Sequence, residues 1–295
     1  MKDINSCPVC ESNESKIHLK SRNFRVNDHA FDVKECTNCS FRYTSPLPEL
    51  NEIGEYYDTE NYISHTGTKK GLINTLFHMV RFITIRSKYR LLKKVSNGKR
   101  HLDIGAGNGV FLSFMKEKGW NVSGVELDDN SRAAIEKNTG LNIATTVNDN
   151  NETEEYDVIT MWHVLEHVYE LKKDIKTIKQ KLKKDGSLIV AVPNCGSYDE
   201  KRYQEFWSAY DLPIHLYHFR PNNIKDLFAQ FDMEVVDMKP MKFDSYWISL
   251  ESEKYKNNQK NSLGVYIKGF FYGLVSNLNA KNGQYSSQIY IIKNK

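Results

Sequence analysis

The chain has 295 residues and a formal net charge of +4, with 40% hydrophobic and 26% charged residues. This composition is typical of a folded globular protein, and the length suits one large domain or two smaller ones. The small net charge does not by itself indicate nucleic-acid binding, and no apolar run is long enough for a transmembrane helix. The first residues lack the hydrophobic core of a secretion signal, so we expect a cytoplasmic location.

Four of the five cysteines form two pairs with the same spacing, Cys7-Pro-Val-Cys10 and Cys36-Thr-Asn-Cys39. Two residues between cysteines let both thiolates reach one metal ion, and two such pairs complete a tetrahedral set for Zn²⁺ with no open position for water. The alternative, a pair of disulfides, is disfavoured in the cytoplasm. We therefore expect a small structural zinc ribbon over residues 1–47, with a hairpin whose arms are residues 24–26 and 31–35.

Residues 48–98 are predicted to form a connector or lid. It opens with a tyrosine-rich stretch and continues with apolar residues at helical spacing. Between Glu60 and Asp103 there is no acidic residue, whereas ten lysines and arginines fall there. This local basic excess is larger than the net charge of the chain suggests.

The most informative stretch runs from Arg100 to Gly109, where an apolar strand leads into a turn with glycine at 105, 107 and 109. Glycines let the backbone bend sharply and approach a ligand closely, and a helical pattern follows at once. A second strand then ends on Glu126, 19 residues past Gly107. A carboxylate at this position can accept hydrogen bonds from both hydroxyls of a ribose. The pattern predicts a nucleotide site.

Dinucleotide enzymes use similar turns, but here the spacing is Gly-x-Gly-x-Gly, and Asp103 precedes the first glycine by two residues. With segments 156–168 and 182–194, these residues resemble a class I S-adenosylmethionine-dependent methyltransferase. The resemblance implies an α/β fold over residues 99–295, with a doubly wound, seven-stranded Rossmann-like sheet in the order 3-2-1-4-5-7-6. The expected strands are near 100–104, 122–126, 142–146, 157–162, 187–193 and 233–239, with a last strand from residue 286 and a helical insertion at 241–285.

The same resemblance implies the positions of the contacts to S-adenosylmethionine. The glycine amides face its methionine portion, Glu126 its ribose, and the end of the fourth strand lies beside it. The tyrosines of the connector resemble an aromatic pair over the methionine end, although packing against the ribbon explains them equally well. The expected contacts are Asp103, Gly105, Ala106, Gly107, Glu126, Leu127, Trp162, His163, Tyr57 and Tyr62.

Methyl transfer needs an aligned acceptor and often a base, and histidine suits the second task because its pKa lies near neutrality. His215 is the first candidate, His218 the second and His163 the third. The segment from His163 to His167 also has the His-x-x-Glu-His pattern of some zinc proteases. It follows a predicted strand between methyltransferase motifs, so we interpret it as part of the methyltransferase site.

The resulting hypothesis is methylation of a small-molecule acceptor, such as a sugar, a quinone-like ring or a phosphate-bearing metabolite. One alternative is an rRNA or tRNA methyltransferase that uses the zinc module to bind RNA, and another is a non-catalytic scaffold that kept the fold. The apolar run that begins at Leu263 suits a packed helix, as a lid or a dimer contact, or a helix in peripheral contact with a membrane.

Overall fold

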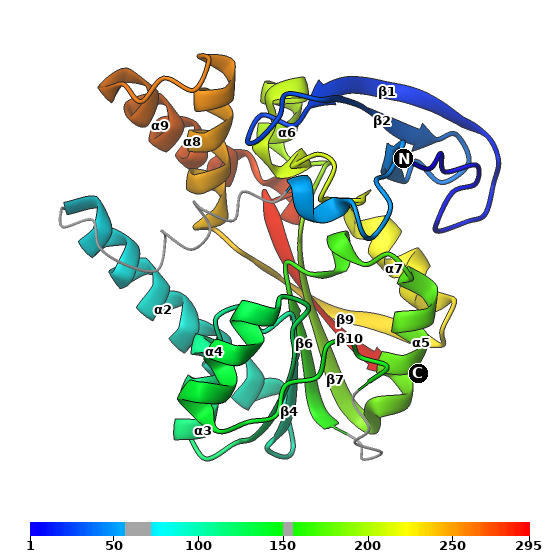
Figure 1. Cartoon of the computed structure of the whole chain (residues 1–295), viewed down its shortest axis with the longest axis vertical. Helices are drawn as coiled ribbons and strands as arrows, with labels where there is room; N and C mark the ends of the chain where they lie inside the picture. Colours follow the sequence, from blue (N-terminus) through cyan, green and yellow to red (C-terminus); the bar gives the residue numbers. More distant parts are fainter. Residues whose placement is uncertain (57–71, 150–155) are drawn as a thin grey trace.

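The computed structural model describes residues 1–56, 72–149 and 156–295. Two sheets organise these residues, a six-stranded sheet in the order β5-β4-β6-β7-β10-β9 and a four-stranded sheet in the order β1-β2-β3-β8. Figure 1 shows the larger sheet at the centre, with the smaller sheet above its right-hand side and the helices α8 and α9 above its left-hand side.

The larger sheet is the one that the sequence resemblance predicts. Its strands are β4 (Arg100–Ile104), β5 (Asn121–Val125), β6 (Tyr156–Trp162), β7 (Leu182–Pro193), β9 (Met233–Pro240) and β10 (Ser287–Asn294). β5, β4, β6 and β7 are parallel, whereas β10 runs antiparallel to both β7 and β9. The central strands are almost continuously apolar and buried, as parallel strands covered on both faces must be.

The order of these six strands agrees with the expected order, but the expected third strand does not form. The segment near 142–146 contributes a single bridge, from Ala144 to Val125, so the sheet has six strands among the described residues instead of seven. Around this bridge only Ile143 and Val147 are buried. Two buried side chains give a full edge strand too little apolar surface to pack.

Helices cover both faces of this sheet. α2 (Leu72–Val95), α3 (Val110–Glu117) and α4 (Asp129–Thr139) lie on one face, and α5 (Leu171–Lys181) and α7 (Pro221–Ala229) on the other (Figure 1). α6 (Tyr198–Tyr203) follows β7. Short 3₁₀ turns complete the chain at η1 (Ile53–Tyr56), η2 (Leu165–His167), η3 (Gln204–Phe206), η4 (Ser208–Tyr210) and η5 (Lys281–Gly283).

The smaller sheet contains β1 (Ser15–Arg22), β2 (Ala30–Cys36), β3 (Arg42–Ser45) and β8 (Tyr217–His218). The first arm of the hairpin is therefore 15–22, and the prediction of 24–26 was wrong. Asn23 explains the difference, because its side-chain oxygen accepts from the amides of Arg25 and Val26 and closes a turn there. β8 shows that the sheet includes residues far beyond position 47.

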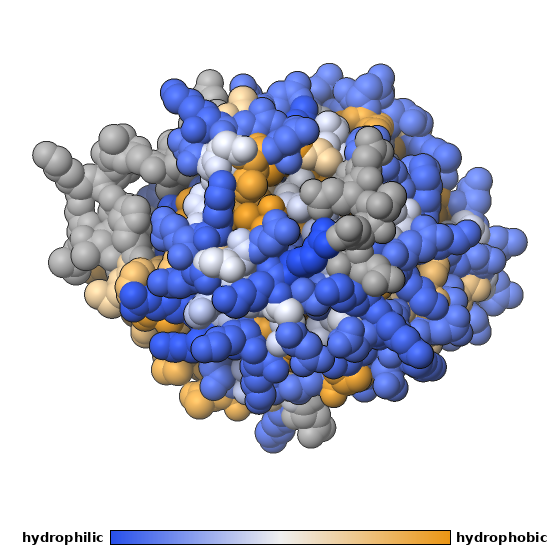
Figure 2. All heavy atoms as spheres, turned by 90° about the horizontal axis from the view of Figure 1, so that it is seen from below, coloured by the Kyte–Doolittle hydropathy of each residue, from blue (hydrophilic) through white to orange (hydrophobic). Residues whose placement is uncertain are grey.

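α8 (Asp244–Lys256) and α9 (Leu263–Asn279) occupy the region predicted as a helical insertion and pack against each other. Within the described ranges, no helix combines the length and the apolarity that crossing a bilayer requires. Viewed from below, most of the visible surface is hydrophilic and hydrophobic atoms occur in small groups (Figure 2).

Candidate functional site

The glycine turn after β4 has the geometry that its sequence predicts. Gly105, Gly107 and Gly109 have φ angles of 71°, 55° and 70°, in the left-handed region that favours glycine. A Cβ on Gly105 would lie 2.3 Å from Val164 Cγ2, and one on Gly109 2.6 Å from Ile135 Cγ1. Space and backbone conformation thus both require glycine at these two positions.

Glu126 joins the tip of β5 to this turn. Its Oε2 accepts a hydrogen bond from the Gly107 amide at 2.6 Å, and its Oε1 accepts from the Asp128 amide at 3.0 Å. These bonds hold the carboxylate beside the glycine backbone, where a ribose would sit. Of the neighbouring predicted contacts, Ala106 is buried, and Leu127 is 61% exposed.

Asp103 lies beneath the turn in a buried hydrogen-bonded chain. Its Oδ1 accepts from the Thr160 hydroxyl at 2.5 Å, and Thr160 Oγ1 lies 2.8 Å from His101 Nε2. Burial raises the pKa of Asp103 to about 7 and lowers the pKa of His101 to about 3. The imidazole is therefore neutral, and its Nε2–H donates to Thr160, since the hydroxyl proton is used on Asp103.

Trp162, at the end of β6, contacts a lysine that the sequence analysis did not single out. The Lys88 ammonium of α2 lies 4.1 Å from the Trp162 ring centroid and 5.6 Å from that of Phe111. Burial lowers the pKa of Lys88 to about 8, although Asp103 and Asp244 oppose this effect. The buried Trp162 Nε1 has no hydrogen-bond partner in the described part of the chain, so a donor is available at this site.

His163 follows Trp162 and is held between two carboxylates. Its Nε2 lies 3.0 Å from Asp244 Oδ2, and its Nδ1 lies 3.3 Å from Glu166 Oε1. Burial alone would lower the pKa of His163, but the two carboxylates outweigh it and raise the pKa to about 10. The side chain is therefore an imidazolium at neutral pH. Its φ of 57° is unusual for a residue other than glycine and is a form of strain often found at functional sites.

His167 and His215 form a pair next to Glu166. Their ring centroids are 4.7 Å apart, and their Nδ1 atoms lie 2.9 and 2.8 Å from the carbonyls of Ile214 and Ala209. These carbonyls fix the proton on Nδ1 and leave the lone pair on Nε2. Burial and the neighbouring His215 lower the pKa of His167 to about 4. Ligand atoms of Glu166, His167 and His215 all lie within 4.8 Å of one another, a spacing that also suits a divalent metal ion.

His218 lies away from this group, in the seam between the two sheets. It is 3% exposed, and its Nε2 lies 3.1 Å from Thr44 Oγ1. The Thr44 hydroxyl donates to the His215 carbonyl at 2.7 Å, so His218 Nε2 must be the donor in the second bond. Burial lowers the pKa of His218 well below its usual value. Thr44 thus connects β3 of the ribbon directly to the His215 loop.

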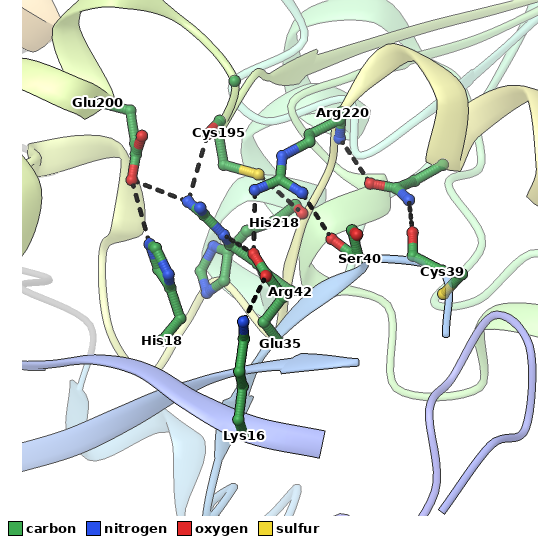
Figure 3. A network of polar contacts seen from close by, with 12 residues as sticks. Lys16, His18, Glu35, Cys39, Ser40, Arg42, Cys195, Glu200, His218 and Arg220 are labelled. Atoms are coloured by element: carbon green, nitrogen blue, oxygen red, sulfur yellow. Dashed lines mark hydrogen bonds and ion pairs between the residues drawn. The ribbon is translucent and has the colours of Figure 1, made fainter. Parts of the chain in front are cut away.

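A network of ion pairs strengthens this seam (Figure 3). Arg42 of β3 bonds to Glu35 through Nε and to Glu200 through Nη1, both at 2.8 Å, and Arg220 bonds to Glu35 at 3.0 Å. Arg220 also donates to the carbonyl of Ser40, next to the second cysteine pair. A cavity of about 600 Å³ adjoins the network, lined by His18, Leu19, Arg42, Cys195, Gly196, Glu200, Lys201, Gln204, Arg220 and Gln284.

The four ribbon cysteines converge as their spacing predicts. Cys7 and Cys39 have their sulfur atoms 3.6 Å apart, Cys10 and Cys36 have theirs 3.5 Å apart, and all four lie within 4.8 Å of one another. In a tetrahedral site with Zn–S bonds of ~2.3 Å, sulfur atoms are about 3.8 Å apart. The set therefore fits a four-thiolate zinc site.

The structure thus brings most predicted site residues to the carboxyl ends of β4, β5 and β6. Tyr57 and Tyr62 lie outside the described residues. Sequence analysis missed Lys88 and Asp244, which reach the site from α2 and α8. Only the general basic character of the connector pointed to Lys88, and no local pattern marked Asp244.

Comparison with known proteins agrees with this geometry. A family model described as a methyltransferase domain matches residues 80–238. The ubiquinone biosynthesis O-methyltransferase of Actinobacillus pleuropneumoniae serotype 7 (strain AP76) is 36% identical over 110 residues, which are 33% of this chain and 47% of that protein. The corresponding enzyme of Rickettsia akari (strain Hartford) is 24% identical over 203 residues, 62% of this chain and 79% of that protein. The chain thus spans about half the length of the first relative.

Two solved structures share the fold at low sequence identity. Coclaurine N-methyltransferase bound to N-methylheliamine and SAH has a TM-score of 0.53 and 15% identity, covering 85% of this chain and 83% of that chain. Magnesium protoporphyrin IX methyltransferase from Synechocystis PCC 6803 with bound SAH has a TM-score of 0.53 and 11% identity, covering 83% and 97%. The family match covers more than half of the 295 residues, so the chain belongs to the methyltransferase-domain family, and the resemblance to class I S-adenosylmethionine-dependent methyltransferases is confirmed.

Proposed function

We propose that this chain transfers a methyl group from S-adenosylmethionine to a hydroxyl group of a small-molecule acceptor, with His215 as the general base. When bound, the cofactor supplies a methyl carbon on a positively charged sulfur, which is a good leaving group. The protein must then bind the cofactor, align the acceptor and remove one proton. Family membership and the residues at the carboxyl edge of the sheet support this assignment.

The hydrogen bond from the Gly107 amide to Glu126 is the observation that carries the proposal. It shows the glycine backbone and the carboxylate together at the tips of two neighbouring strands. The glycine turn admits the methionine portion of the cofactor, and Glu126 accepts hydrogen bonds from the ribose hydroxyls. Trp162 and Asp103 adjoin this site and complete the contacts that the resemblance implies.

His215 is suited to act as the base because its Nε2 carries the lone pair. Its Nδ1–H donates to the Ala209 carbonyl at 2.8 Å, which sets the tautomer and the ring orientation. The acceptor hydroxyl would give its proton to Nε2 as its oxygen takes the methyl group that the bound cofactor would supply, and the electron pair of the broken carbon–sulfur bond would stay on sulfur. The curated relatives are named as O-methyltransferases, which favours an oxygen acceptor.

The other two candidate bases take different roles. His163 is already protonated at neutral pH, since Asp244 and Glu166 raise its pKa to about 10. It serves as a fixed cation that joins β6 to α8. His218 uses Nε2 to donate to Thr44 and is buried in the seam, so it positions the His215 loop.

The balance of charges on the ribbon favours a small-molecule acceptor over RNA as the substrate. Residues 1–47 contain seven lysines and arginines against six aspartates and glutamates. Several of these charges are paired within or near the ribbon, as in Arg22–Asp28 and Arg42–Glu35. A surface that binds nucleic acid needs an excess of unpaired positive charge. We assign the ribbon a structural role, and we propose that its four cysteines hold one Zn²⁺.

The test is methyl transfer with a labelled cofactor. The protein is incubated with methyl-labelled S-adenosylmethionine and with separate catechol, quinol, nucleotide-sugar and tRNA acceptors, and the products are identified by mass spectrometry. We expect label in a small molecule. His215→Gln should lower kcat by roughly 10²–10⁴-fold with an unchanged cofactor Kd, whereas His29→Gln, at an exposed position, should match the wild type.

Three results would contradict the proposal. Label found in tRNA alone would replace the small-molecule assignment with the RNA alternative. Wild-type turnover by His215→Gln would remove His215 as the base. The third result is a loss of activity on adding a chelator while the ribbon keeps its zinc, followed by recovery of that activity on adding a divalent cation. This result would assign His215 to a metal site with Glu166 and His167.

A further inference from the structure

α9 exposes large apolar side chains to solvent, whereas a surface helix in water normally exposes polar ones. Its outward side carries six large apolar residues with exposed fractions from 41% to 76%. They recur at helical spacing along one side, so they form a continuous stripe. The residues are Leu263, Ile267, Phe270, Phe271, Leu274 and Leu278.

The inward side of α9 buries few apolar atoms, since its buried residues are Val265, Gly269, Gly273 and Ser276. A Cβ on Gly269 would lie 2.6 Å from Leu250 Cα, and one on Gly273 2.6 Å from Tyr246 Cα. Ser276 is buried and donates to Asp199 at 2.8 Å. These contacts prevent the helix from turning its large apolar side chains toward the protein. The exposed stripe is therefore a fixed feature of the packing between α8 and α9.

Two further helices on this side of the molecule also expose large apolar residues. Phe243, just before α8, is 46% exposed, and Trp247 on α8 is 44% exposed. On α2, Met79, Phe82 and Ile83 are 55%, 51% and 45% exposed. Figure 1 shows that α2, α8 and α9 project from the same side of the molecule. We call the stripe on α9 and these five residues the apolar face. A surface of this kind marks an interaction site.

The exposed charges on α2, α8 and α9 are basic, because the three acidic residues of α8, Asp244, Glu251 and Glu253, are paired or buried. α9 contains no acidic residue and one lysine, Lys268. Lys256 at the end of α8 and Lys260 in the connection to α9 are exposed, and Lys281 follows α9. The described part of α2 adds Arg81, Arg86, Arg90, Lys93 and Lys94, with no acid in the whole helix. A second copy of the chain on this face would bring like charges together, whereas an anionic lipid surface attracts them.

We propose that the apolar face binds the surface of an anionic lipid bilayer. α9 lies in the plane of the interface with its apolar stripe among the acyl chains, and the lysines reach the lipid headgroups. The helices α2 and α8, which carry part of the apolar face, also send Lys88 and Asp244 to the candidate site. The proposal rests on the exposed surface and does not depend on the acceptor or on His215.

The test is co-sedimentation of the full-length protein with vesicles of phosphatidylcholine, with and without phosphatidylglycerol. We expect binding to the anionic vesicles that weakens as salt concentration rises. The double variant Phe270→Ser, Phe271→Ser should bind at least about tenfold more weakly, because each phenyl ring contributes apolar burial. Ile17→Ser and Leu50→Ser, at positions 50% and 58% exposed elsewhere, should bind as the wild type does.

A second variant and a spectroscopic readout separate binding from folding. Lys260→Glu, Lys268→Glu keeps the apolar face but should lose preference for phosphatidylglycerol, with an unchanged circular dichroism spectrum. Trp247 is more exposed than Trp120 or Trp207, which are 6% and 2% exposed, so its emission should shift to the blue on lipid. Absence of vesicle binding at low salt would refute the proposal. A lipid-free dimer that the phenylalanine variant abolishes would assign the face to a second copy.

Discussion

Replacing Thr44 by valine tests whether the ribbon supports the His215 loop. Valine has nearly the shape of threonine, so the change removes the hydroxyl that bonds to the His215 carbonyl at 2.7 Å and to His218 Nε2 at 3.1 Å. Each buried group left without a partner costs about 1–3 kcal/mol. The Nε2–H of His218 is buried, whereas the carbonyl of His215 is only partly buried and loses less. We therefore expect the free energy of unfolding to fall by about 2–3 kcal/mol.

The stability change is measured by urea denaturation and the functional change by steady-state kinetics. A shift of His215 by a fraction of an ångström should lower kcat by roughly tenfold to a hundredfold. The Kd of S-adenosylmethionine should not change, because the proposed cofactor contacts lie at the carboxyl ends of β4, β5 and β6 and not on Thr44 or the His215 loop. Thr37→Val removes an exposed ribbon hydroxyl and should stay within about 0.5 kcal/mol of the wild type. If Thr44→Val is as stable and as active as Thr37→Val, the ribbon does not support the catalytic loop.

Three further predictions concern the turn, the imidazolium and the metal. Gly109→Ala meets both a positive φ and Ile135, so it should destabilise the protein by about 1–3 kcal/mol more than Gly140→Ala, where φ is 67° and the space is open; equal losses in thermal denaturation would exclude the clash. The pKa of His163 in the folded protein is raised to about 10, so its contribution to the free energy of unfolding is complete below the unfolded pKa near 6.5 and declines as pH rises toward 10. Asp244→Asn should flatten this decline in the free energy of unfolding. Parallel pH profiles for the variant and the wild type would contradict the ion pair. Atomic absorption should find one zinc per chain, and its removal should lower kcat before the larger sheet unfolds; full activity without zinc would refute the structural role.

Local patterns were sufficient to predict the part of the fold that carries the proposed cofactor site. The strand to Ile104, the glycine turn and the acid at Glu126 depend on neighbouring residues and on backbone conformations that glycine alone adopts easily. The cysteine pairs are similar, because their spacing is a direct constraint of metal geometry. The hairpin arm was misplaced because Ser15–Arg22 is mostly exposed and alternates weakly, whereas Phe24 and Val26 resemble a strand but sit in a turn closed by a side chain.

The rest of the site depends on contacts between segments far apart in the sequence. Asp244, at the start of α8, contacts His163, and Lys88 of α2 contacts Trp162. Neither contact has a local sequence signal. The apolar run from Leu263 predicted a packed helix, but Gly269 and Gly273 permit close packing on α8 only through the small side of α9. The orientation of that helix follows from tertiary packing and could not be read from hydrophobicity.

Calorimetric titration of the purified protein with S-adenosylmethionine tests the central claim most directly. We predict binding at one site per chain, with an affinity that falls roughly tenfold to a hundredfold in Glu126→Ala, since a charged hydrogen bond contributes about 1.5–3 kcal/mol. Nicotinamide dinucleotides should give no heat. An absence of binding to the wild type, or an unchanged Kd in Glu126→Ala, would show that the glycine turn and the acid of β5 do not form the cofactor site.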